Sequence, residues 1–256
     1  AYIDRSQSGH LQLSDALTYD PLDAEERIRL EEDEKQRTSQ FTNKFRQGIK
    51  QGTIPAVKFK SIVVEGVPED TILEHAKLNN PPLIVMGTRA IVKKEKDLIG
   101  SVTAEVLDSC RAPAFTIPET MSLEDIRNIR NIVLFSSLEQ SDILVLDAFY
   151  RLFPKYDFNI TIVCVPGRRQ SNANTVQGVK AMIDYCTSHY PDYSFDLRMF
   201  TNETAVEGFN KLYAEGKAEM MVVPNRKKNI FARLFNPGLA HKLLFHADIP
   251  MMVIPV

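Results

Sequence analysis

Short apolar runs alternate with longer amphipathic segments over the second half of the chain. The runs predict strands, because about four to eight apolar residues bounded by turn residues suit a strand buried on both faces. The segments between them predict helices with one apolar face against a sheet. The predicted strands cover residues 131–135, 159–165, 193–200, 220–223 and 251–254, and the predicted helices cover residues 141–153, 174–189, 203–214 and 239–246. This order indicates a parallel sheet covered by helices.

The first half repeats the later part of that pattern. We predict strands at residues 57–64, 83–86 and 114–117, and helices at residues 69–77 and 101–109. A longer helix is predicted at 23–50, with acidic residues early and basic residues late, as the helix dipole favours. Nothing in the first half corresponds to the first strand and helix of the second half. We therefore expect the first half to lack roughly 30 residues at its start.

Two segments of the chain align without a gap at a constant offset, residues 81–119 with residues 218–256. A repeat of this length indicates two copies of one domain. We predict an α/β fold of two tandem doubly wound parallel-sheet domains, at residues 1–122 and 128–256, with the first domain truncated at its start. We also predict that residues 114–117 pair with residues 251–254, which would join the two halves into an intramolecular pseudo-dimer.

Composition narrows the class of protein. The 256 residues are 44% apolar and 25% charged, with a formal net charge of −2, which is typical of a globular protein. Such a charge provides no basic field for nucleic acid, and no apolar run approaches the about 18 residues of a membrane span. We expect a cytoplasmic protein with no nucleic-acid or membrane partner. The three cysteines are too few and too scattered for a disulfide framework or a zinc site.

One stretch of the first half carries the elements of a phosphate site. The apolar run of residues 83–86 ends at Gly87, and Gly100-Ser101 stands at the start of a predicted helix. Glycine lets a ligand approach the backbone, and a helix start offers unpaired N–H groups and the positive end of the dipole. The hydroxyl of Ser101 adds a side-chain donor. The stretch therefore predicts a nucleotide or another phosphate ligand.

The spacing in this stretch resembles a known family. Gly87-Thr-Arg-Ala90, followed after nine residues by Gly100-Ser101, is similar to the Gly-x2-Gly-x9-Gly-(Ser/Thr) signature of the ATP-binding branch of the universal stress protein family. The apolar strand before it and the segment Cys110-Arg-Ala-Pro-Ala-Phe-Thr-Ile-Pro118 after it match as well. The chain looks like a tandem member of this family. The resemblance implies five-stranded sheets in the order 3-2-1-4-5 and association through the last strands, as a homo-oligomer or as the pseudo-dimer.

The resemblance also implies where a nucleotide binds in the first half. A strand end, a loop over the ribose and phosphates, and a helix start would together hold ATP or AMP, with Mg²⁺ only beside ATP. The implied residues are Met86, Gly87, Arg89, Ala90, Gly100, Ser101 and Val102. Alanine at position 90 replaces the second glycine of the signature, which costs on the order of 1 kcal/mol if that position needs a positive φ.

The second half departs much further from the signature. Pro224, Lys227, Pro237 and Gly238 replace its three glycines and its serine. Proline has no N–H, so Pro224 and Pro237 remove donors where a phosphate would need them. We therefore expect the second half to be a degenerate, structural copy.

No catalytic constellation accompanies these motifs. The five histidines lack the spacing of a metal site, and the sequence contains neither a nucleophile elbow nor a P-loop. We expect a protein that is not an enzyme, although slow ATP hydrolysis stays open. Two functions are compatible with the sequence. One is a stress-response regulatory protein that binds an adenine nucleotide in its first half. The alternative is a protein–protein interaction scaffold that binds no nucleotide.

Overall fold

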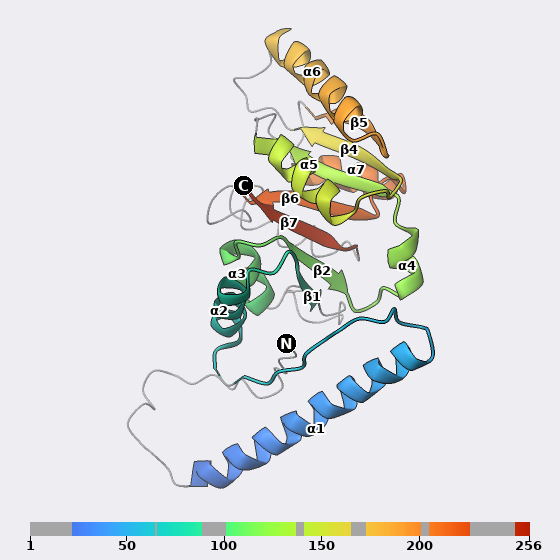
Figure 1. Cartoon of the computed structure of the whole chain (residues 1–256). Helices are drawn as coiled ribbons and strands as arrows, with labels where there is room; N and C mark the ends of the chain where they lie inside the picture. The colour runs from blue at the N-terminus through green and yellow to red at the C-terminus, as the bar shows by residue number, and fades with distance from the viewer. Residues whose placement is uncertain are drawn as a thin grey trace, which may run out of the picture. The chain divides into compact units, whose positions relative to one another are not determined.

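The computed structural model describes residues 22–64, 66–88, 101–136, 141–164, 173–200, 205–225 and 249–256 (Figure 1). The chain forms two compact units, Ala1–Ile72 and Leu73–Val256. These units have a different boundary from the predicted repeats at residues 1–122 and 128–256, and the division into repeats stays a prediction.

The first unit contains a long helix followed by an extended segment. Helix α1 (Leu22–Lys50) agrees with the predicted helix at 23–50. The chain turns after it at Gly52, whose φ of 73° lies in the left-handed region that glycine adopts without strain. The extended segment then packs on the helix, where the rings of Phe45 and Phe59 meet edge to face with centroids 4.7 Å apart. The guanidinium of Arg46 lies 5.9 Å from the centroid of the Phe59 ring.

The strand predicted at residues 57–64 is wrong. These residues form no ladder with any described strand, and Val57, Phe59, Val63 and Val64 are exposed. Apolar β-formers are not sufficient for a strand, because its N–H and C=O groups need a neighbouring strand as a hydrogen-bond partner. Without that neighbour the segment stays extended and unpaired.

The second unit is built on one seven-stranded sheet. Its order is β1-β2-β7-β6-β3-β4-β5, and every neighbouring pair is parallel except β2 with β7. The strands are β1 (Ile84–Thr88), β2 (Ala114–Pro118), β3 (Asn131–Ser136), β4 (Phe158–Cys164), β5 (Tyr193–Met199), β6 (Met220–Asn225) and β7 (Met251–Pro255). This mostly parallel α/β arrangement confirms the predicted fold class. The five strands of the second half follow the order 3-2-1-4-5, while the described residues of the first half contribute two strands instead of a five-stranded sheet.

The described helices agree closely with the predicted ones. They are α2 (Pro68–Asn79), α3 (Ser101–Ser109), α4 (Leu123–Asn128), α5 (Ser141–Leu152), α6 (Ala173–His189) and α7 (Ala205–Ala214). Helix α4 was not predicted, although Ser122 and Asp125 form a reciprocal capping box at its start. The helix predicted at residues 239–246 lies outside the described residues.

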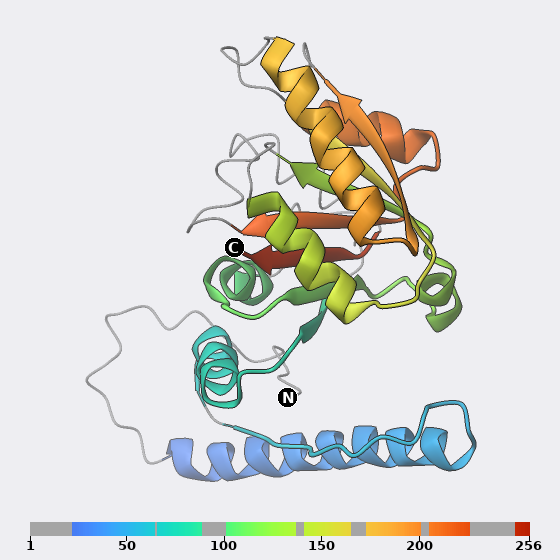
Figure 2. The same cartoon turned by 45° about the horizontal axis from the view of Figure 1, so that its top comes forward.

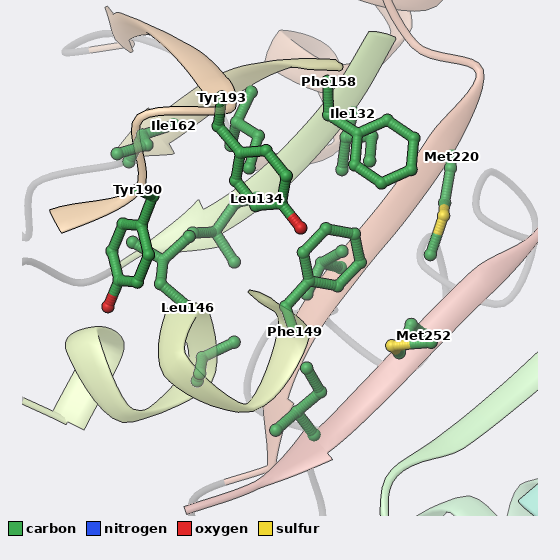
Figure 3. Close-up of a cluster of buried hydrophobic side chains, with 14 of the residues drawn as sticks. Ile132, Leu134, Leu146, Phe149, Phe158, Ile162, Tyr190, Tyr193, Met220 and Met252 are labelled. Carbon is green, nitrogen blue, oxygen red and sulfur yellow. The ribbon is translucent and has the colours of Figure 1, made fainter. Parts of the chain in front are cut away.

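Helices α5 and α6 cover one face of the sheet and α7 the other, as Figures 1 and 2 show. On the first face Phe149 of α5 packs in a cluster with aromatic and aliphatic side chains of β3, β4, β5, β6 and β7 (Figure 3). On the second face Phe135 of β3 meets Phe209 of α7, with ring centroids 6.2 Å apart. The runs that looked apolar on both faces are thus buried on both faces, as a central parallel sheet requires.

The two halves of the chain meet at the antiparallel pair of β2 and β7. Phe115 lies opposite Met252, and the hydroxyl of Thr116 donates to the carbonyl oxygen of Met251 at 3.3 Å. Phe115 belongs to the same buried cluster as the second-half side chains, so the core continues across this seam. The predicted pairing of residues 114–117 with 251–254 is confirmed.

The strand pairs on the two sides of the seam have the same internal geometry. Ile84 pairs with Ala114 as Met221 pairs with Met251, at the offset found in the sequence. The amide that follows each last strand donates to the end of its neighbour, from Glu119 to Thr88 at 3.1 Å and from Val256 to Asn225 at 3.0 Å. The register of β1 with β2 is therefore the register of β6 with β7.

Candidate functional site

Strand β1 carries the first part of the predicted site. Its side chains alternate between the faces of the sheet, with Met86 on one face and Val85 and Gly87 on the other. Val85 is 57% exposed, and Gly87 is exposed too. A Cβ added to Gly87 would meet no atom of the described residues within 4 Å, and the φ of Gly87 is not in the left-handed region. Neither backbone conformation nor described packing therefore requires glycine at this position.

Helix α3 carries the second part of the site. It begins at Ser101, as the sequence predicts, and its first turn contains no acidic side chain that would repel an anion. Val102, Val106 and Leu107 are buried and hold the helix against the rest of the unit. The first-turn amides have no intrahelical carbonyl partner, which leaves them available to a ligand.

The predicted site also includes residues of the loop between these two parts. Arg89, Ala90 and Gly100 lie outside the described residues, and so does the side chain of Ser101. The structure describes the strand end at Met86 and Gly87, and the helix that contains Val102. The seven-residue nucleotide site stays a prediction.

The carboxyl end of α3 is held by the other half of the chain. Asn225, the last residue of β6, is buried, and its Nδ2 donates to the carbonyl oxygens of Leu107 at 3.1 Å and of Asp108 at 3.3 Å. The sequence contains no local signal for this contact, because it joins residues more than a hundred positions apart.

Asp108 places a poorly satisfied carboxylate at the same helix end. Its Oδ1 is buried and makes no hydrogen bond with the described residues. Burial raises the pKa of this carboxyl above its ordinary value, and the charge of Glu105 one turn earlier adds to the rise. A negative charge at a helix carboxyl end also opposes the helix dipole.

The second half has a packed interior where the first half has an open strand end. Pro224, the counterpart of Gly87, is buried in β6. At the end of β3 the hydroxyl of Ser136 donates to Oδ2 of the buried Asp142 at 2.6 Å. Lys227, Pro237 and Gly238 lie outside the described residues. Proline in β6 lacks the N–H that a phosphate would need at this position.

The described residues contain no group of three or more side chains suited to hold a metal ion. The cysteines are free and buried, and burial raises the thiol pKa to about 11 at both Cys110 and Cys186. These thiols are therefore protonated and unreactive at neutral pH. Within the described part of the chain, no helix has both the length and the apolar character needed to cross a membrane.

Comparison with known proteins connects this geometry to a family. Residues 8–118 match the model of the universal stress protein family. A universal stress protein of Methanocaldococcus jannaschii is 36% identical over 61 residues, which make up 24% of this chain and 36% of that protein. The chain thus matches little more than a third of the length of that relative.

Solved structures share the fold at low sequence identity. A universal stress protein from Archaeoglobus fulgidus superposes with a TM-score of 0.65 at 15% identity, over 88% of this chain and 80% of that one. A functionally unknown protein from Pseudomonas aeruginosa superposes with a TM-score of 0.56 at 11% identity, over 85% and 78% of the two chains. The structural likeness supports the fold alone, and the family model relates residues 8–118 to this family by sequence. The part of the chain between residues 8 and 118 therefore matches the universal stress protein family, and the solved structures share its fold.

Proposed function

We propose that this chain is a stress-response regulatory protein that binds an adenine nucleotide, ATP or AMP, in its first half. The family of residues 8–118 supports the stress-response role. The second half acts as a structural copy without a nucleotide of its own. The protein works by binding rather than by catalysis, and Mg²⁺ enters only as a companion of ATP.

The open space at Gly87 is the observation that carries the proposal. Glycine inside a strand costs stability, because it loses more backbone entropy and packs no side chain. The described fold provides no compensating reason at Gly87, since neither a left-handed φ nor a close described neighbour requires it. Close approach of a ligand to the backbone is a reason that accounts for it. The start of α3, free of acidic side chains, supports a ligand with negative charge.

The matching register of the two strand pairs supports a tandem arrangement. β1 with β2 and β6 with β7 share their pairing and their closing hydrogen bond. The antiparallel pairing of β2 with β7 occupies the last strand of each half within a single chain. These contacts favour an intramolecular pseudo-dimer over a homodimer built through the same two strands.

Calorimetric titration of the whole chain with ATP and with AMP tests nucleotide binding. Gly87→Val places a branched side chain in the open space, where valine also suits a strand. We expect this variant to fold as well as the wild type and to bind nucleotide at least tenfold more weakly. Gly100→Val tests the helix start in the same way. The matched control is Val85→Ala, which alters the same exposed face of β1 two residues earlier and should leave affinity unchanged.

Each result has a distinct meaning. Wild-type protein that binds neither nucleotide refutes the proposal and favours the interaction scaffold. Binding that Gly87→Val and Gly100→Val leave unchanged refutes the site while keeping the ligand. Phosphate release measured with ATP and Mg²⁺ checks the absence of catalysis, since sustained turnover would contradict a purely binding role.

A further inference from the structure

The contact between Asn225 and helix α3 joins the two halves of the chain at the end of α3 that lies opposite the proposed site. Both hydrogen bonds run from one side-chain amide to main-chain carbonyl oxygens, those of Leu107 and Asp108, at 3.1 and 3.3 Å. The amide nitrogen must be the atom that faces them, because a carbonyl oxygen can only accept. The orientation of the Asn225 side chain is therefore fixed by chemistry.

These carbonyls belong to the turn where a helix needs outside partners. The last four C=O groups of an α-helix have no intrahelical donor. At α3 the backbone amide of Cys110 satisfies Val106, and Asn225 satisfies the next two carbonyls from β6. Because Asn225 is only 8% exposed, water cannot easily replace it. The second half thus provides part of the carboxyl-terminal cap of a helix in the first half.

We propose that Asn225 is a positioning residue, which sets the orientation of α3 and thereby the affinity of the nucleotide site at its other end. The proposal rests on the nucleotide binding proposed above. It gives the second half a role beyond that of a structural copy, since a side chain of its strand β6 adjusts the site of the first half.

The length of α3 makes such control effective. Nine residues span about 13 Å at about 1.5 Å per residue. A tilt of about 10° about the carboxyl end would displace the amino end by about 2 Å on this length. Hydrogen bonds to phosphate need donor–acceptor distances near about 2.9 Å, so a displacement of that size breaks them. Anchoring one end of the helix therefore governs the amides at the other.

Two variants remove the anchor in different ways. Asn225→Leu keeps the bulk and removes the donor, and Asn225→Ala, which removes both, serves if leucine disturbs folding. The matched control is Asn159→Leu, because Nδ2 of Asn159 also makes a side-chain hydrogen bond from a strand, to Oδ1 of Asn131 at 3.1 Å, away from α3. Hydrogen exchange of the amides of residues 101–109 reports the anchor, and calorimetry with ATP reports the site.

We expect faster exchange in α3 and about tenfold weaker ATP binding in the Asn225 variants, and neither change in Asn159→Leu. Unchanged exchange in α3 overturns the proposal whatever the nucleotide does. Faster exchange with unchanged ATP affinity overturns it too, because the anchor would then be purely structural. If the wild-type protein binds no ATP, the proposed function fails by itself, and the control of affinity falls with it. The exchange measurement then tells these two failures apart.

Discussion

Replacing Asp108 by asparagine is expected to stabilise the protein at neutral pH. Oδ1 of Asp108 is buried and finds no hydrogen-bond partner in the described part of the chain, and the charge stands at the carboxyl end of α3 near Glu105. An unpaired charge costs about 1 kcal/mol more to bury than the neutral amide that replaces it, and its opposition to a helix dipole costs about 0.3–1 kcal/mol. Because Asp108 is only partly buried, solvent screening reduces the sum, and we expect a gain of about 1 kcal/mol.

The pH dependence of this gain follows from the direction of the pKa shift. The folded protein raises the pKa of Asp108 above its ordinary value of 3.8, so folding favours the protonated carboxyl. The stability contributed by that group is fully present below the unfolded pKa and is lost as pH rises through the folded pKa. The asparagine amide that replaces it in the variant does not titrate. The difference between variant and wild type should therefore be near zero below about pH 4 and reach its full size at neutral pH.

Urea unfolding of wild type and Asp108→Asn at a series of pH values measures this difference. Glu105→Gln is the matched control, because it removes the neighbouring charge but leaves the charge of Asp108 in place, and it should gain only a few tenths of that amount. A variant that is less stable at neutral pH would refute the reasoning. So would a gain that is equally large in acid, because it could not come from the ionised carboxylate.

Three further experiments test other parts of the structure. Glu219→Gln should lower the free energy of unfolding in urea by about 1–2 kcal/mol. Oε2 of Glu219 accepts from two backbone amides at the start of β3, at 2.7 and 2.8 Å, and the glutamine variant loses the charge that strengthens both bonds. Phe149→Ala should cost about 3–5 kcal/mol in the same assay, whereas Tyr156→Ala, at an exposed ring, should cost far less. Thiol labelling at about pH 8 should leave Cys110 and Cys186 unmodified until urea unfolds the protein, since burial raises both thiol pKa values to about 11. Rapid labelling of the folded protein would contradict the buried positions.

Local patterns were sufficient to predict most of the second unit. Runs such as residues 131–135 and 251–254 are apolar at nearly every position, which a strand buried on both faces explains at this length. The segment at 57–64 has similar residues but lies extended without a partner, because pairing depends on a neighbour that no local pattern encodes. Helix α4 was missed for the opposite reason. Its six residues carry a capping box but too little apolar periodicity to stand out.

The residues of the candidate site also differ in whether local sequence could predict them. Gly87 and the start of α3 could be predicted, because a strand end and a helix start are local features. Asn225 and Asp108 could not, since their roles come from the packing of β6 against α3 and from burial. A side chain that caps a helix from a distant strand has no signature in its own neighbourhood. Such contacts follow from topology, and here from the antiparallel seam between β2 and β7.

The aligned ends of β1 and β6 show how equivalent positions in the fold can have two different roles. Both strands pair in the same register with the strand that closes their half. Gly87 leaves its backbone uncovered, whereas Pro224 is buried and the next residue, Asn225, turns its side chain to α3. A ligand at Gly87 needs space and donors, and an anchor at Asn225 needs close packing. One strand end cannot meet both demands, and here the two demands fall on different strands.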